Sequence, residues 1–234
     1  MKRATLDALN AARRDKRAAV LAKHLKTGAE QLLFPDETEL AIEGIEGIEI
    51  GAAVRDAVRA DRSTTVDTPA GPVFLNVFNP PLRLIVVGAV HIAQALAPAA
   101  SAAGYDVTIV DPRGAFAAQD RFAGVRLVDD WPDDFLDREP ADARTAVVTL
   151  THDPKLDDAA LDRALASPAF YIGSLGSRKT HAARLERLSA RGFDDTALAR
   201  IHGPVGLAIG ARSPAEIAIA VLAQITQVLR APLR

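Results

Sequence analysis

The residues with the clearest chemical pattern lie in LIVVGAVHIAQALAPAASAAGYDVTIVD, which runs from Leu84 to Asp111. An apolar run ends at Gly88, an alanine-rich helical segment follows, and a second apolar run ends at Asp111. In a dinucleotide-binding βαβ unit, the helix start receives a pyrophosphate, and an acid about 20 residues further on receives a ribose hydroxyl. Asp111 follows Gly88 by 23 residues (111 − 88), so the segment predicts a unit of this kind.

The glycine turn departs from the usual G-x-G-x-x-G/A pattern at one position. It runs Gly88-Ala89-Val90-His91-Ile92-Ala93, so Val90 replaces the second glycine. A Cβ there obstructs close approach of backbone and pyrophosphate, which argues against NAD(P) binding. Asp111 is either a ribose acceptor or a cap on the turn before Pro112. Arg113 nearby could instead accept a phosphate.

A second candidate site follows the fifth expected strand, in the loop Gly173-Ser174-Leu175-Gly176-Ser177-Arg178-Lys179. Its glycines and hydroxyls run straight into a helix whose first turn carries Arg178 and Lys179. Exposed cations at that place oppose the helix macrodipole by about 0.3–1 kcal/mol each. Two explanations are open. A phosphate or other anion bound there would make the cations favourable, or the side chains point into solvent, which screens the unfavourable interaction. We expect Gly173, Ser174, Gly176, Ser177, Arg178 and Lys179 to contact an anionic ligand.

Four of the five histidines lie in or beside loops of the second half of the chain, namely His91, His152, His181 and His202. Their spacing resembles no standard ligand motif, so we expect no metal held by the protein. We expect His91 and His152 to contact a ligand. No Ser-His-Asp order stands out, and Ser174 lacks the G-x-S-x-G context of a nucleophile, so no catalytic residue is named.

Strands and helices alternate from Arg83 onward, which predicts a Rossmann-like, mainly parallel α/β sheet with helices on both faces. Ligands bind at the carboxyl ends of such strands, so the loops at Gly88–His91, Thr151–Pro154 and Gly173–Lys179 should share one rim. The expected strands are 84–87, 107–110, 125–128, 146–150 and 169–172. The expected helices are 91–103, 156–166, 179–191 and 215–229.

The segment before residue 80 has less regular patterning and predicts a small α+β domain. Helical stretches are expected near 4–14 and 51–60, and strands near 18–25, 63–67 and 72–78. Asn79-Pro80-Pro81 ends this segment, because consecutive prolines admit neither a helix nor a central strand. The predicted domains are therefore 1–79 and 80–234.

Composition narrows the class of protein. The 234-residue chain is 49% apolar and 25% charged with a net charge of −2, which is typical of a soluble globular protein and indicates no nucleic-acid partner. It has no cysteine, which excludes disulfides, thiolate metal sites and a cysteine nucleophile and suits the cytoplasm. No apolar run approaches the roughly 20 residues of a membrane span.

Three segments together resemble the xanthine dehydrogenase accessory family of XdhC/CoxI type. They are YIGSLGSRKTHAARLERL (171–188), RIHGPVGLAIGARSPAEIAIAVLAQI (200–225) and Pro80-Pro81-Leu82-Arg83 before the βαβ unit. The resemblance covers residues 80–230. Residues 1–79 resemble a shortened N-terminal domain of the family more loosely.

The resemblance implies a non-catalytic maturation factor for molybdenum hydroxylases. Such a protein binds the molybdenum cofactor, as molybdopterin or its cytosine dinucleotide form, while a cysteine desulfurase or sulfurase partner installs the sulfido ligand. It then delivers the cofactor to an apo-enzyme such as xanthine, aldehyde or CO dehydrogenase. A homodimer is expected by the same analogy. The cofactor phosphate would be a natural occupant of the Gly173–Lys179 loop.

Two residues depart from the family pattern. Val90 stands where many relatives carry glycine, and Ala208 stands where relatives often carry aspartate, so any role of that acid is missing here. Two other functions remain open. One is an NAD(P)-binding oxidoreductase that uses the Gly88 crevice, and the other is a docking protein that binds no ligand.

Overall fold

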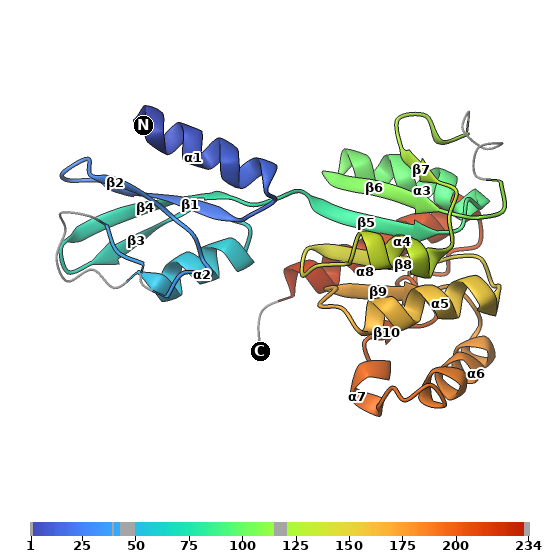
Figure 1. The fold of residues 1–234 in the computed structure, drawn as a ribbon. Helices are drawn as coiled ribbons and strands as arrows, with labels where there is room; N and C mark the ends of the chain where they lie inside the picture. The colour runs from blue at the N-terminus through green and yellow to red at the C-terminus, as the bar shows by residue number, and fades with distance from the viewer. Residues whose placement is uncertain (1, 39, 43–49, 115–120, 232–234) are drawn as a thin grey trace. The chain divides into compact units, whose positions relative to one another are not determined.

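The computed structural model describes residues 2–38, 40–42, 50–114 and 121–231 (Figure 1). The chain divides into two compact units, Met1–Pro80 and Pro81–Arg234. Each is described by itself. Among the described residues, every helix is too short or too polar to cross a membrane.

The described part of the first unit contains an antiparallel sheet in the order β2-β1-β4-β3 together with two helices. Side chains alternate along the second strand of this order. Val20 and Ala22 pack in one apolar cluster with the second helix, whereas Ala19 packs in another with the first helix. The helices therefore cover opposite faces of the sheet (Figure 1). The elements are α1 (Arg3–Arg14), β1 (Ala19–His24), β2 (Glu30–Leu33), α2 (Gly51–Arg59), β3 (Thr64–Thr68) and β4 (Gly71–Phe78).

The described part of the second unit contains a six-stranded parallel sheet in the order β10-β9-β8-β5-β6-β7. Its strands are β5 (Leu82–Val87), β6 (Tyr105–Val110), β7 (Arg126–Val128), β8 (Thr145–Thr149), β9 (Tyr171–Ser174) and β10 (Ile201–His202). Its helices are α3 (His91–Ala102), α4 (Pro132–Arg138), α5 (Pro154–Leu165), α6 (Arg178–Ser189), α7 (Asp195–Leu198) and α8 (Pro214–Arg230). Counted from β7, the strands follow the doubly wound order 3-2-1-4-5-6. The predicted fold class is confirmed.

The central strand β5 shows why the sheet is covered on both faces. Leu84 and Val86 pack with apolar residues of α3 and α8, and Ile85 and Val87 pack with those of α4 and α5. A strand that is buried on both faces has a continuous apolar run in place of an alternating one. Figure 1 shows the two helical layers on either side of the strands.

Some element boundaries differ from the sequence-based expectation. The strand expected at 169–172 is β9 and runs from Tyr171 to Ser174, so Gly173 and Ser174 belong to the sheet and not to the loop that follows. The elements β2, α4, α7 and β10 were not expected. Most of them have four residues or fewer, which is too short for a periodic pattern to stand out.

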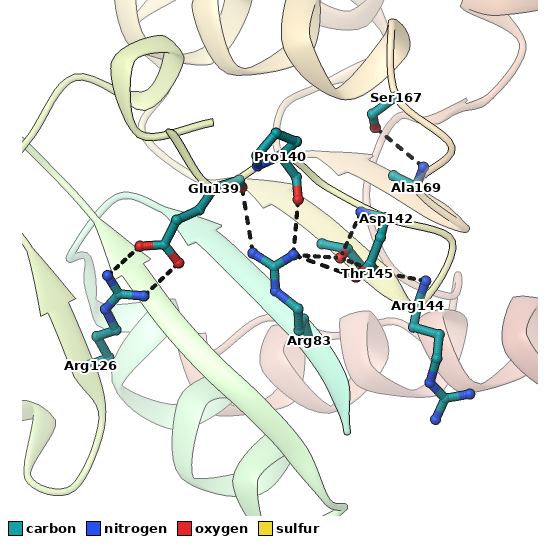
Figure 2. Close-up of polar contacts among 9 residues, drawn as sticks. All are labelled: Arg83, Arg126, Glu139, Pro140, Asp142, Arg144, Thr145, Ser167 and Ala169. Carbon is teal, nitrogen blue, oxygen red and sulfur yellow. Dashed lines mark hydrogen bonds and ion pairs between the residues drawn. The ribbon is translucent and has the colours of Figure 1, made fainter. Parts of the chain in front are cut away.

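The amino ends of β5 and β8 are joined by polar groups that bind one another (Figure 2). Arg83 donates to the carbonyl of Pro140 at 2.9 Å and to the hydroxyl of Thr145 at 3.4 Å. Asp142 accepts from the Thr145 hydroxyl at 2.7 Å and from the Arg144 amide at 2.9 Å. These groups stabilise the edge of the sheet opposite the expected ligand rim.

Arg200 stabilises the connection between α5 and β9. Its guanidinium donates to the carbonyls of Leu165, Ser167 and Ala169 at 2.7, 2.9 and 3.0 Å. Carbonyls at a helix end have no partner within the helix, so an arginine that satisfies several of them fixes the chain there.

We predict that Arg200→Met lowers the free energy of unfolding by about 2 kcal/mol, because hydrogen bonds from a charged donor contribute about 1.5–3 kcal/mol. Urea unfolding measures the loss. Arg191→Met is the matched control, since Arg191 forms an ion pair with Asp162 at the surface, where such pairs contribute about 0–1 kcal/mol. Equal losses in the two variants would contradict the role given to Arg200.

Candidate functional site

The carboxyl edge of the sheet contains a point where the strand order reverses. β6, the strand that follows β5 in the chain, lies on one side of β5, and β8 lies on the other side. The loops after β5 and β8 meet there. Gly88 has a φ of 112°, and a Cβ on it would lie 2.8 Å from Cγ2 of Thr151. A glycine is needed at this position both for its backbone conformation and for contact with the neighbouring loop.

Asp111 lies at the end of β6 with its side chain almost fully buried. Its Oδ2 accepts from the Ala89 amide at 2.8 Å and from Nη2 of Arg113 at 3.0 Å. Its Oδ1 accepts from the Arg113 amide at 2.9 Å and from Nε of Arg113 at 3.0 Å. The hydrogen bond from the Arg113 amide to Asp111 caps the turn, which is one of the two roles that the sequence predicted for this aspartate. The structure thus brings Ala89, Asp111 and Arg113 together.

The surroundings of Asp111 favour its charged form. Burial acts to raise the pKa of this carboxyl, but the Arg113 side chain and the amides of Ala89 and Arg113 outweigh it. The pKa of Asp111 is therefore lowered. Asp111 is an anion that the protein itself already neutralises.

Val90 and His91 stand at the start of α3. Val90 is the residue before the helix, has an extended backbone, and packs half-buried against the apolar cluster beneath α3. Its side chain does not cap the helix, and the first turn contains no acid. His91 is exposed. This helix start therefore presents an imidazole at the rim.

The loop after β8 contains His152, which is exposed and has a left-handed φ of 62°. Beneath it, the Thr151 hydroxyl donates to Oδ1 of Asp157 at 2.6 Å. Asp157 is 2% exposed, and burial raises the pKa of its carboxyl despite the Thr151 contacts. Sequence reasoning missed Asp157, although an aspartate on the apolar face of α5 was a signal that could have found it.

The first two residues of the expected anion loop lie in the interior. A Cβ on Gly173 would lie 2.6 Å from Cγ2 of Val205 and 2.8 Å from the Tyr171 ring, so packing alone requires glycine. Ser174 is fully buried, and its hydroxyl lies 2.5 Å from the Thr149 hydroxyl on the adjacent strand. The proposed contact of these two residues with a ligand stays a prediction.

The last residues of the loop lie at the surface. Gly176 has a φ of 145°, and Ser177 caps α6 by accepting from the Thr180 amide at 3.1 Å. Arg178 and Lys179 follow in the first turn and are exposed. Among the described residues, no carboxylate forms an ion pair with either cation, and the first turn of α6 contains no acid. The cations are therefore free to meet an anion from solution.

Arg184 holds this loop from beneath. It is 2% exposed, and its Nη2 donates to the Leu175 carbonyl at 2.7 Å. Burial lowers the pKa of Arg184, and the nearby charges of Asp157 and Asp158 act in the opposite direction. Its Nη1 lies 3.5 Å from Nδ1 of His181. Sequence reasoning also missed Arg184. Arginines of a helix usually lie in solvent, and nothing in the sequence distinguished this one.

The remaining loop histidines do not form a metal site. His202 stacks on Tyr171 with ring centroids 4.8 Å apart, and burial lowers the pKa of both His202 and His181. The described residues contain no group of three or more histidine, aspartate or glutamate side chains placed to hold a metal ion.

A hollow of about 740 Å³ lies beside α6 and α7, away from most of the rim. Its lining includes the acids Glu186 and Asp195 together with apolar residues, and His181 reaches it from the rim side. Acidic side chains repel phosphate, so this hollow does not suit the anionic ligand expected from the sequence.

The fold and the rim define a Rossmann-like domain whose glycine turn departs from the dinucleotide-binding pattern at Val90. Residues 84–225 match the XdhC Rossmann domain. This chain therefore belongs to the XdhC family.

Relatives in two bacterial genera are similar to the chain. It is 33% identical to the molybdenum cofactor insertion chaperone PaoD of Escherichia coli, over 64% of this chain and 41% of PaoD. It is 31% identical to a probable xanthine dehydrogenase subunit of Bacillus subtilis, over 74% of this chain and 52% of that protein. A crystal structure described as a xanthine dehydrogenase from Bacillus halodurans matches with a TM-score of 0.73 and 25% identity, over 99% of this chain and 66% of that one. The chain thus spans about half the length of these curated relatives.

We predict that Ser174→Ala lowers the free energy of unfolding by about 1–3 kcal/mol, because it leaves the buried Thr149 hydroxyl without its described partner. The double variant Thr149→Val/Ser174→Ala should recover part of the loss, since removing both partners of a buried hydrogen bond is often close to neutral. Chemical unfolding of the three proteins tests this. Strictly additive losses would show that the two hydroxyls do not stabilise each other.

We predict that Asp111→Asn makes stability less sensitive to acid. The lowered pKa of Asp111 stabilises the fold above the unfolded value of about 3.9. This contribution is lost as pH falls from about 4 through the folded pKa. The melting temperature of the variant should lie below that of the wild type at pH 7, and the gap should narrow towards pH 3. Asp106→Asn, an exposed aspartate on the same strand, is the control, and a constant gap for Asp111→Asn would contradict the assignment.

Proposed function

We propose that this protein binds the molybdenum cofactor and delivers it to a molybdenum hydroxylase. Membership of the XdhC family supports a role in maturation, and the similarity to PaoD, which is named a molybdenum cofactor insertion chaperone, supports the cargo. The similarity to a probable xanthine dehydrogenase component supports a hydroxylase as the recipient.

One observation carries the proposal, namely the pair of exposed cations Arg178 and Lys179 at the start of α6 on the ligand rim. Their positive charges oppose the partial positive charge of the helix start, which is unfavourable unless an anion binds there. The cofactor phosphate is such an anion. Ser177 and Gly176 lie beside the two cations and would complete its contacts.

The neighbouring loops offer groups suited to the rest of the cargo. His91 and His152 are exposed near the starts of α3 and α5, where they could donate hydrogen bonds to polar atoms of the pterin. The chain has no cysteine, so molybdenum would keep its pterin sulfur ligands and gain none from the protein. Gly88, Ala89, Val90, Asp111 and Arg113 would line the adjoining crevice, with Gly173 and Ser174 beneath the anion loop.

The finer steps belong to the same proposal. A cysteine desulfurase or other sulfurase would install the sulfido ligand while the cofactor is held, and an apo-hydroxylase would then receive it in the cytoplasm. The protein would act as a homodimer and as a carrier, without catalysing a reaction of its own. Two residues argue against the competing NAD(P)-dependent oxidoreductase. Asp111 already accepts hydrogen bonds from Ala89 and Arg113, and the Val90 side chain stands where the pyrophosphate would approach the backbone.

We predict that Arg178→Ala/Lys179→Ala weakens binding of the molybdenum cofactor at least tenfold, since charge-assisted contacts with phosphate contribute about 1.5–3 kcal/mol each. The melting temperature should stay almost unchanged, because both side chains are exposed. Anaerobic isothermal titration of the purified protein measures the affinity.

Arg13→Ala/Arg14→Ala provides a matched control, since it removes two consecutive exposed cations from α1. NADH and NADPH serve as parallel titrants. Full affinity in the Arg178/Lys179 variant would remove this loop from the site. Binding of the nicotinamides alone would favour the oxidoreductase, and binding of no titrant would favour a docking protein without a ligand.

A further inference from the structure

The carboxylate of Asp111 is saturated by donors of its own chain. Among the described residues, four N–H groups donate to it, two on each oxygen, at 2.8–3.0 Å. An ionised carboxylate has about four lone-pair positions. A ribose diol could therefore bind Asp111 only by displacing one or more of these donors. We name the trio Ala89, Asp111 and Arg113 the Asp111 latch.

The latch uses two subsites of a dinucleotide crevice together. The acid at the end of the second strand is the usual ribose acceptor, and amides of the glycine turn usually face the pyrophosphate. Here the Ala89 amide donates to Asp111, so the two groups satisfy each other. Val90 follows with a side chain where the second glycine would admit phosphate. Both parts of the crevice that would recognise a nucleotide are occupied by the protein.

The backbone around the latch belongs to the sheet, which limits its movement. The Gly88 amide donates to the Val110 carbonyl at 2.9 Å, and the Asp111 amide donates to the Val128 carbonyl at 3.0 Å. Asp111 is 4% exposed, whereas the Arg113 side chain is about half-exposed. Opening the latch would leave a buried carboxylate with fewer donors, which is unfavourable. Only the Arg113 side chain has room to leave.

We infer that this protein takes the molybdenum cofactor in its nucleotide-free form, which ends in a phosphate monoester, in preference to the cytosine dinucleotide form. This inference rests on the function proposed above. The added nucleotide would bring a ribose and a pyrophosphate to groups that the Asp111 latch already engages. A terminal monoester instead concentrates about −1.5 to −2 charges at pH 7, which suits the cations Arg178 and Lys179.

The test compares both forms of the cofactor on the full-length protein by anaerobic isothermal titration. The wild type should bind the nucleotide-free form at least tenfold more tightly than the cytosine dinucleotide form. Arg113→Ala removes two of the four donors to Asp111 and should narrow this ratio by at least threefold through tighter binding of the dinucleotide form. ADP-ribose, a ribose and pyrophosphate probe without a pterin, should also bind Arg113→Ala more tightly than the wild type.

Arg126→Ala is the matched control, because Arg126 also forms a two-pronged ion pair, with Glu139, but away from the ligand rim (Figure 2). It should leave the ratio of the two affinities unchanged. Arg113→Gln keeps part of the side chain and serves if the alanine variant does not fold. The ratio of the affinities for the two cofactor forms should narrow in Arg113→Gln as well.

Equal affinity of the wild type for the two forms, or a preference for the dinucleotide, would overturn the inference while leaving the proposed function intact. An unchanged ratio in both Arg113 variants would overturn the role of the latch. If the wild type bound neither form, the proposed function would fail and this inference with it.

Discussion

The arrangement of the second unit depends on the pairing of β5 with β6 on one edge and β8 on the other. Because β5 is buried on both faces, its apolar side chains must be covered by helices from both sides. The strands of this sheet all run parallel, so the loops that leave their carboxyl ends lie at the same edge of the sheet. The loops containing Gly88, His152 and Arg178 meet at one rim for this reason, although they are far apart in sequence.

Buried charges fix the shape of that rim from below. Asp157 holds the loop after β8 through Thr151, and Arg184 holds the loop after β9 through the Leu175 carbonyl. Each also has one buried atom, Oδ2 of Asp157 and Nε of Arg184, that lacks a hydrogen-bond partner among the described residues. Burial is the largest influence on both groups: it raises the pKa of Asp157 and lowers the pKa of Arg184, and the charge of each acts against the shift of the other. Each of the two loops is therefore held from beneath by a buried polar side chain of the helix that follows it.

The sequence predicted the parts of the molecule in which the pattern was long, and missed those that depend on tertiary contact. The βαβ unit from Leu84 to Asp111 was predictable because apolar runs and a glycine turn agreed. Helix α8 was expected at 215–229, and in the structure it begins with a capping box. Ser174 was placed in a loop because serine and glycine are common there, yet Thr149 on the neighbouring strand draws its hydroxyl into the sheet. Asp157 and Arg184 could not be recognised, since their importance comes from burial by distant segments.

The modified glycine turn and the Asp111 latch have a common physical basis. A crevice that admits pyrophosphate must keep a turn amide and an acid free to meet the ligand. When Val90 occupies the approach and packs against the core, an unused amide and carboxylate would remain there without partners, which is unfavourable at a buried position. Ala89 and Asp111 satisfy each other, and Arg113 neutralises the remaining charge. The fold can then keep the loops of a nucleotide-binding protein without the free amide and carboxylate that would recognise a nucleotide.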